Sequence, residues 1–236
     1  MTLVPGALNF RDVGGLPAGA AATRPRVLFR SGNLARLTGE GCRALADLGV
    51  RRIVDLRADD EVATEPSRVD GLGLETVRIP LFVGSVGSFF AEDRSLAQMY
   101  RELVDGSAPQ LVEATRAVLG AQPVLVHCTV GKDRTGVTIA LLLAAAGVDE
   151  DAIVADYART EELLPPERNG RVLAYLRTLH PDARHLDDLV TRSPATVMRD
   201  LLADVRGRYG GAADYLRAYG LTEGEVAALR THLIEE

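Results

Sequence analysis

The chain has 236 residues, 47% of them hydrophobic and 25% charged, with a formal net charge of −6. Its length suits one large domain or two small ones, and its composition is that of a globular protein with a sizeable core. The acidic balance argues against broad nucleic-acid binding, which needs a basic surface, and two cysteines are too few for a disulfide framework.

Signals for membrane insertion or secretion are not visible. The longest apolar run, residues 137–147, is too short to span a bilayer. The first 13 residues contain Arg11 and Asp12 and lack an uninterrupted apolar stretch, so they do not read as a signal peptide. We therefore expect a cytoplasmic protein without an integral membrane segment, although non-classical export leaves no mark in a sequence.

Strand-like and helix-like patterns alternate through the first 147 residues. Short apolar or β-branched runs predict strands at residues 27–30, 52–56, 76–79 and 124–126. Between them, Thr38 and Ser95 suit helix N-caps, and Pro109 suits a first helical turn. This alternation predicts an α/β fold with a central, mostly parallel sheet flanked by helices.

From residue 148 onward the pattern is helical only. Asp149 can cap a helix and the pair Pro165-Pro166 breaks it. Further helical patterns cover residues 172–179, 197–205 and 222–233. No linker rich in Gly, Ser or Pro marks a boundary, so we expect a single domain over residues 1–236 with a C-terminal helical layer.

The segment PVLVHCTVGKDRTG, residues 123–136, carries the chemistry. An apolar strand ends at Cys128, Arg134 follows after five intervening residues, and an apolar helix begins at once. A loop between a strand and a helix N-terminus can turn successive backbone N–H groups inward, and the helix adds the positive end of its dipole. The same field favours the thiolate of Cys128, which is the nucleophilic form.

This loop has the donors that a phosphoryl group needs. The planar guanidinium of Arg134 can donate two hydrogen bonds to phosphoryl oxygens. The hydroxyl of Thr135 can hydrogen-bond the sulfur and help it leave. The residues predicted to bind phosphate are Thr129, Val130, Gly131, Lys132, Arg134 and Thr135.

Other interpretations of the segment fit less well. A lone cysteine at a strand end is usually a small buried side chain, but here it shares one motif with His, Gly, Arg and Thr. A nucleotide-binding loop would need Gly at Val126 and Ser or Thr at Asp133. A zinc site at His127 and Cys128 lacks a second pair of ligands at usable spacing.

His127-Cys-x5-Arg-Thr-Gly136 resembles the signature of the protein tyrosine phosphatase superfamily. The narrower form Gly131-Lys-Asp-Arg-Thr-Gly136 resembles the atypical bacterial group typified by mycobacterial protein tyrosine phosphatase B. Further segments similar to that group are residues 9–15, 28–31, 55–57, 154–157 and the tail near 209–215. The resemblance implies the phosphatase fold with a helical lid from about residues 160–195, and chemistry that uses no metal ion or other cofactor.

The general acid is the point at which the chain departs from the usual pattern. Tyrosine phosphatases place an aspartate on a separate loop to protonate the leaving oxygen, but residues 80–83 after the third strand contain no carboxylate. Glu92 and Asp93 lie further on. We favour Asp133, because its position places a carboxylate at the rim of the loop; its alternative role is to orient Arg134 or to cap the helix.

Several charged residues can support the site. Lys132 can meet a second phosphate, as in lipid-headgroup phosphatases of the superfamily, or can be a solvated side chain. His127 faces away from phosphate and supports the loop by hydrogen bonding. The residues expected to brace the site by ion pairs are Arg11 with Asp12 and Asp55 with Arg57, and Glu61 is expected to orient the loop.

These residues predict cysteine-dependent hydrolysis of phosphate monoesters through a phosphocysteine on Cys128. The resemblance implies a phosphorylated protein substrate, with phosphotyrosine favoured and dual specificity allowed. A phosphoinositide or a soluble inositol or sugar phosphate is the alternative substrate that Lys132 supports. A pseudophosphatase that only binds a phosphorylated partner is the alternative from another functional class.

Overall fold

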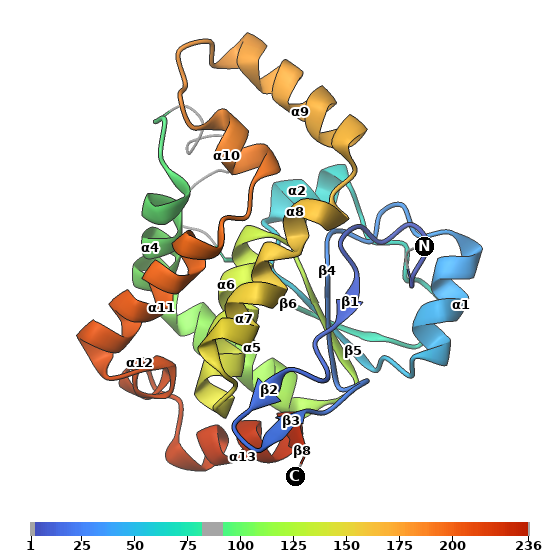
Figure 1. Cartoon of the computed structure of the whole chain (residues 1–236). Coiled ribbons are helices and arrows are strands. Elements are labelled where there is room, and N and C mark those ends of the chain that lie inside the picture. The colour runs from blue at the N-terminus through green and yellow to red at the C-terminus, as the bar shows by residue number, and fades with distance from the viewer. Residues whose placement is uncertain (1–2, 82–91, 236) are drawn as a thin grey trace.

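A computed structural model describes residues 3–81 and 92–235 of the chain. Its central sheet has five strands in the order β1-β4-β7-β5-β6 (Figure 1). Their bounds are Arg11–Asp12 for β1, Leu28–Ser31 for β4, Val124–His127 for β7, Arg52–Asp55 for β5 and Glu75–Arg78 for β6. Strand β1 is antiparallel to β4 and the other four strands are parallel, which confirms the predicted sheet.

The parallel strands deliver their carboxyl ends to one edge of the sheet. Ser31, His127 and Asp55 end their strands at one register position. All four residues of β7 are buried, as expected of a continuous apolar strand covered on both faces. The loop that follows β7 therefore starts at the edge where open α/β sheets bind ligands.

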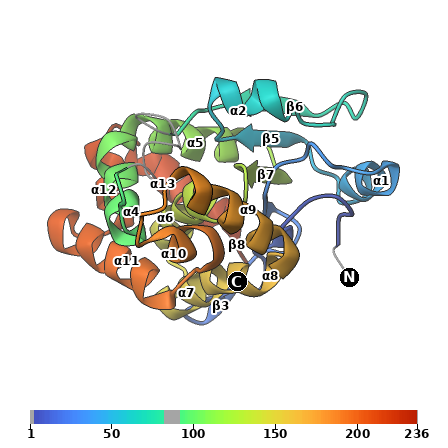
Figure 2. The same cartoon turned by 90° about the horizontal axis from the view of Figure 1, so that it is seen from above.

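Twelve helices are described, and most lie on one side of the sheet (Figure 2). They are α1 (Gly39–Asp47), α2 (Asp59–Thr64), α4 (Leu96–Gly106), α5 (Ala108–Gly120), α6 (Asp133–Ala146), α7 (Glu150–Ala158), α8 (Thr160–Leu163), α9 (Pro166–Leu179), α10 (Leu186–Thr191), α11 (Ala195–Tyr209), α12 (Ala212–Ala218) and α13 (Glu223–Leu233). The predicted N-caps at Thr38 and Ser95 form hydrogen bonds to the first turns of α1 and α4. Asp149 precedes α7, but its carboxylate accepts from the N–H of Gly19.

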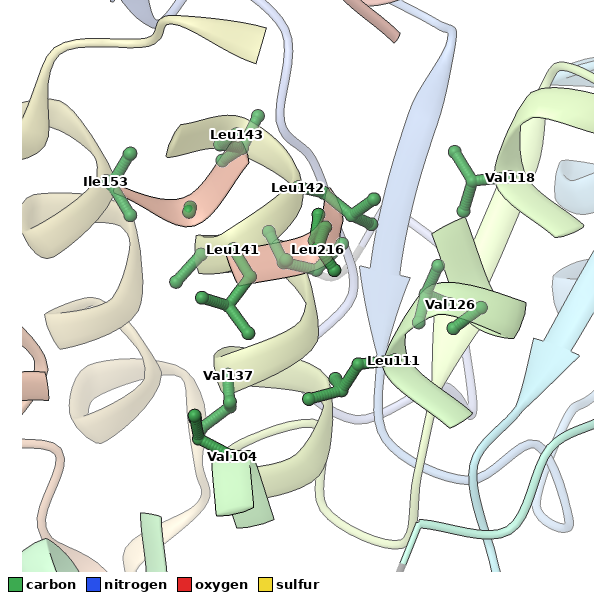
Figure 3. Close-up of a cluster of buried hydrophobic side chains, with 14 of the residues drawn as sticks. Val104, Leu111, Val118, Val126, Val137, Leu141, Leu142, Leu143, Ile153 and Leu216 are labelled. Atoms are coloured by element: carbon green, nitrogen blue, oxygen red, sulfur yellow. The ribbon is translucent and has the colours of Figure 1, made fainter. Parts of the chain in front are cut away.

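Two hydrophobic cores use alternate side chains of the strands. Phe29, Ile53 and Leu125 pack on the side of α1, whereas their neighbours Val54 and Val126 join the larger core around α6. Figure 3 shows this larger core, in which side chains of α5, α6 and β7 meet. Eleven of the fourteen residues of α6 are buried, so this helix is the centre of the helical layer and its N-terminus is held firmly.

The prediction that strands stop after residue 147 was wrong. Strand β8, Ile234–Glu235, pairs with β3, Ala21–Thr23, which also pairs with β2, Pro17–Ala18. Elements of two or three residues carry too little periodicity to be detected in a sequence.

The segment predicted as a lid, residues 160–195, contains α8, α9 and α10. Figure 1 shows α9 and α10 at the same end of the molecule as α2. They share a small hydrophobic cluster of their own, formed around Leu176, Leu186 and Val190. Pro166 begins α9 and does not interrupt α7, which already ends at Ala158. Within the described ranges no helix is long and apolar enough to cross a bilayer.

Candidate active site

The loop between β7 and α6 turns its carbonyl groups outward. The carbonyls of residues 128–131 all accept hydrogen bonds from donors outside the loop. The carbonyl of Cys128 accepts from His127 Nδ1 at 3.2 Å, and that of Thr129 from the N–H of Asn33 at 3.0 Å. Asn9 Nδ2 donates to the carbonyls of Val130 at 3.3 Å and Gly131 at 2.9 Å, and Arg30 Nη2 also donates to Gly131 at 2.9 Å. In a planar trans peptide, the N–H of the next residue points the opposite way. The N–H groups of residues 129–132 therefore face inward, as a cradle for an anion requires.

Cys128 lies at the base of this cradle. Its side chain is buried, it forms no disulfide, and its Sγ accepts a hydrogen bond from the N–H of Gly131 at 3.3 Å. The sulfur therefore lies within reach of the inward amides of the loop. Gly131 has a φ of +73°, and a Cβ there would lie 2.4 Å from the backbone of Ser31, so only glycine fits.

Arg134, in the first turn of α6, is held by Glu61 of α2. Its Nη1 and Nη2 lie 2.6 and 2.7 Å from the two carboxylate oxygens of Glu61, which also accepts from the hydroxyl of Thr129. Burial opposes ionisation, but the hydrogen bonds and charge of Arg134 lower the pKa of Glu61 to about 2. Glu61 was expected to orient the loop, and the structure brings it to the guanidinium.

Asp133 begins α6 and has a partner that the sequence did not indicate. The hydroxyl of Tyr100 donates to its Oδ1 at 2.8 Å, and the hydroxyl of Tyr157 lies 2.7 Å from that of Tyr100. The carboxylate remains 22% exposed, whereas both tyrosines are buried. The predicted acid thus lies between a buried pair of hydroxyls and the accessible side of the loop.

The side chain of Lys132 is not exposed to solvent and does not point into the cradle. The residue is buried, and its ammonium donates to carbonyls at the end of α10, those of Asp188, Leu189 and Arg192, at 3.2, 2.6 and 3.0 Å. Burial lowers its pKa, against the opposing charge of Asp133. The solvated alternative was therefore wrong, because the sequence could not show that a helix end lies above this position.

Thr135 was expected to hydrogen-bond the sulfur. Its hydroxyl is buried and has no hydrogen-bond partner among the described residues, so this bond is not formed in this conformation. Gly136 serves packing: a Cβ there would lie 3.1 Å from the ring of Tyr157.

The ion pair of Asp55 and Arg57 forms as predicted, at 2.7 Å and buried. The Nε2 of His127 lies 3.6 Å from the same carboxylate, and burial lowers the pKa of His127 despite that charge. A neutral imidazole can donate from Nδ1 to the carbonyl of Cys128, which is the supporting role expected of it.

The predicted pairing of Arg11 with Asp12 was wrong. Asp12 accepts from the backbone N–H groups of Gly14 and Arg26. Arg11 instead pairs with Asp156 of α7 at 2.7 Å, and the second oxygen of that carboxylate binds Arg30 at 2.7 Å. The side chains of Arg11, Arg30 and Asp156 are all buried, and burial together with the charge of Arg30 lowers the pKa of Arg11 to about 9.

Asn9, Arg30 and Asp156 complete this support, and sequence reasoning did not single them out. Arg30 connects Asp156 to the carbonyl of Gly131, and Asn9 binds the same carbonyl. For Arg30 and Asp156 the available signal was a charged residue within an apolar strand or helix, which has to find a buried partner. All three residues also lie in the segments 9–15, 28–31 and 154–157, which resemble the phosphatase group. Within residues 3–81 and 92–235, no three metal-ligating side chains come together.

A buried cysteine and an arginine, placed at opposite ends of an inward-facing amide loop at the carboxyl edge of a parallel sheet, define the class of the site. The model of the tyrosine phosphatase family matches residues 2–235. The chain belongs to this family and is a phosphoric monoester hydrolase of it.

Two relatives cover most of the chain. It is 32% identical to the triple specificity protein phosphatase PtpB of Mycobacterium tuberculosis, over 98% of both chains. It is also 32% identical to a tyrosine-protein phosphatase of Nostoc commune, over 92% of this chain and 78% of that one.

Two solved structures have lower sequence identity to the chain. The catalytic core of the PP-IP phosphatase SIW14 from S. cerevisiae has a TM-score of 0.41 and 18% identity, over 71% of this chain and 91% of that one. P. aeruginosa TpbA has a TM-score of 0.40 and 19% identity, over 80% and 99%.

Proposed function

We propose that this phosphatase hydrolyses its substrates in two steps through a phosphocysteine. In the first step the Cys128 thiolate attacks phosphorus, and the P–O bond breaks as Asp133 gives its proton to the leaving oxygen. In the second step water attacks the phosphocysteine, Asp133 takes a proton from that water, and the S–P bond breaks to return the thiolate. Inward N–H groups and Arg134 stabilise the charge on the phosphoryl oxygens in both steps.

The outward carbonyls of residues 128–131 carry this proposal. Each is bound by a donor outside the loop, so the inward orientation of the amides is fixed before substrate arrives. Preorganised donors of this kind need no rearrangement during the reaction. A cysteine that was merely a packing residue would need no such loop.

Phosphotyrosine in proteins is the substrate that we favour, with breadth toward phosphoserine, phosphothreonine and phosphoinositides. The names of the two relatives, a triple specificity protein phosphatase and a tyrosine-protein phosphatase, support this choice. The phosphoinositide alternative rested on Lys132. Its ammonium is bound to three carbonyls of the α10 end, which weakens that support.

The mechanism is tested with Cys128→Ser and Arg134→Lys, and with Cys42→Ser as the matched control. Turnover of 4-nitrophenyl phosphate should be abolished by the first change, fall at least a hundredfold with the second and stay unchanged in the control. Acid quenching during turnover should trap a phosphoryl adduct on Cys128. Binding of a phosphotyrosyl peptide without turnover by the intact protein would instead support a pseudophosphatase. A side-by-side comparison of turnover on that peptide and on phosphoinositide vesicles separates the two substrate classes.

A further inference from the structure

A chain of hydroxyl groups leads from the interior to Asp133. Tyr157 of α7 and Tyr100 of α4 lie with their hydroxyl oxygens 2.7 Å apart, and Tyr100 then donates to Oδ1 of Asp133 at 2.8 Å. Both tyrosines are less than 2% exposed. Three helices therefore converge on one carboxylate.

This pair of tyrosines is a built feature of the core. The rings are 6.0 Å apart between centroids and meet edge to face at 83°. The ring of Tyr157 approaches α6 so closely that a Cβ on Gly136 would lie 3.1 Å away. Packing alone would need only two phenylalanines, since each buried hydroxyl costs free energy unless it is hydrogen-bonded. The hydroxyls therefore point to a role beyond packing.

The hydroxyl of Tyr100 keeps its proton beyond the pH at which an ordinary tyrosine loses it. Burial, the negative charge of Asp133 and the neighbouring Tyr157 all raise the pKa of Tyr100 well above its usual value. The hydroxyl of Tyr157 is available to orient the hydroxyl of Tyr100, because burial and the charge of Asp133 raise its pKa as well.

We infer that Tyr100 is a positioning residue for the general acid Asp133 and that Tyr157 orients Tyr100. This inference rests on the proposed function, in which Asp133 carries the transferred proton. The hydroxyl of Tyr100 and the ammonium of Lys132, which is 3.5 Å away, both contact Oδ1. Oδ2 is then the oxygen left to carry the transferred proton.

The proton transfer in the first step shows what Tyr100 does beside Asp133. The P–O bond breaks with its electron pair on oxygen, the proton of Oδ2 moves to that oxygen, and Asp133 becomes a carboxylate. The O–H of Tyr100 already points at Oδ1 and stabilises the new charge. In the second step Oδ2 regains a proton from the attacking water, and Tyr100 keeps the carboxyl group in place.

The leaving group makes this inference testable. A weakly basic leaving group, such as 4-nitrophenolate, departs without a proton, whereas phenolate, like tyrosine, needs one. Loss of Asp133 is expected to lower the rate about 10²–10⁴-fold on a substrate that releases phenolate. Misplacement of Asp133 should cause a smaller loss of rate, and only on the substrate that releases phenolate.

The experiment compares Tyr100→Phe with the intact protein on 4-nitrophenyl phosphate and phenyl phosphate. We expect kcat/KM to fall about tenfold on phenyl phosphate and less than twofold on 4-nitrophenyl phosphate. Tyr157→Phe should act in the same direction with a smaller effect, and it carries the test if Tyr100→Phe does not fold. The matched control is Tyr215→Phe, which removes another buried hydroxyl, bonded to the carbonyl of Val104 at 2.6 Å, and should not change the ratio of the two substrates.

Asp133→Asn separates the inference from the function on which it rests. If Asp133 is the acid, this variant loses activity mainly on phenyl phosphate, and adding Tyr100→Phe to it causes no further loss. Equal losses on both substrates in Tyr100→Phe, or a further loss in the double variant, would show a structural role and overturn the inference. If Asp133→Asn itself shows no leaving-group dependence, Asp133 is not the acid, and the mechanism proposed above fails at that step.

Discussion

Asn9 offers a direct test of how the loop is held. Its amide Nδ2 donates to the carbonyls of Val130 and Gly131 at 3.3 and 2.9 Å, and its side chain is buried. Asn9 has a φ of +55°, so Asn9→Gly removes the side chain at a backbone conformation that glycine accepts. The substitution changes no residue of the loop between β7 and α6, and it removes no charge.

The magnitude follows from the carbonyls that lose a donor. Gly131 keeps the bond from Arg30, but Val130 loses the amide that binds its carbonyl. A buried acceptor left unsatisfied costs about 1–3 kcal/mol, and for the part-buried carbonyl of Val130 this range is an upper estimate. If the loop escapes that cost by turning the carbonyl inward, the amide of the next residue is lost from the cradle. Since 1.36 kcal/mol is a factor of ten, kcat/KM should fall about 5- to 150-fold.

The assay measures kcat/KM for 4-nitrophenyl phosphate, the inhibition constant of inorganic phosphate and the free energy of unfolding in denaturant. Both phosphate-dependent quantities should weaken together. The control is Arg26→Gly, since Arg26 is exposed and has a φ of +60° at the opposite end of β4. If Asn9→Gly lowers stability but leaves kcat/KM and inhibition within twofold, the outward carbonyls do not depend on Asn9 and the reasoning is refuted.

Three further changes probe other contacts. The pKa of Glu61 is about 2 against an ordinary 4.5. Its bond to Arg134 therefore stabilises the fold above about pH 4.5, and this stabilisation is lost as the pH falls through 2. Glu61→Gln should make the free energy of unfolding decline less steeply between these two pH values. Lys132→Met should speed amide hydrogen exchange in α10 at least tenfold while α11 is unchanged, because it removes the donor of three carbonyls. Gly131→Ala should reduce kcat/KM at least a hundredfold, whereas Gly170→Ala, at an open position of α9, should raise stability by up to ~1 kcal/mol.

The parts of the site that could be predicted are local in sequence. Cys128 and Arg134 are six positions apart in one strand–loop–helix unit, so spacing and residue type were sufficient to place them together. The four parallel strands were found for the same reason, since each is a short apolar run bounded by turns. The assignment of Asp133 as the general acid stays a prediction. Asp133 precedes Arg134 in the sequence, so its position beside the loop does not test this role.

The support of the site was not predictable because it joins distant segments. Asn9 lies 122 positions from Gly131, and Arg30 lies 126 positions from Asp156. A sequence shows that a charged residue lies in an apolar element, but it does not show which partner neutralises it. Arg11 was assigned to its neighbour Asp12 for want of that information, and the structure pairs it with Asp156.

The segment Val154-Ala-Asp-Tyr157 shows what such information adds. From its sequence it is one turn of a predicted helix, and a resemblance to related proteins gives no reason for its two polar residues. In the fold, Asp156 binds the two arginines behind the loop, and Tyr157 faces the hydroxyl of Tyr100. Adjacent residues thus support two different parts of the site, the orientation of the amides and the position of Asp133.

The charges around the loop explain how an acidic protein can hold a phosphate. The buried cations that touch or support the loop are Arg11, Arg30, Arg57, Lys132 and Arg134, and the carboxylates paired with them are Asp156, Asp55, Asp133 and Glu61. Within the described part of the chain, this group has two positive charges in excess when Asp133 is protonated, as its role as the acid requires, and a thiolate on Cys128 would neutralise one of them. The rest of the charge of an incoming phosphate then has to be met by the inward N–H groups and the N-terminus of α6, beside the guanidinium charge of Arg134. Phosphate affinity therefore depends on amide orientation more than on net charge, which is why Asn9→Gly, a substitution that changes no charge, is expected to weaken it.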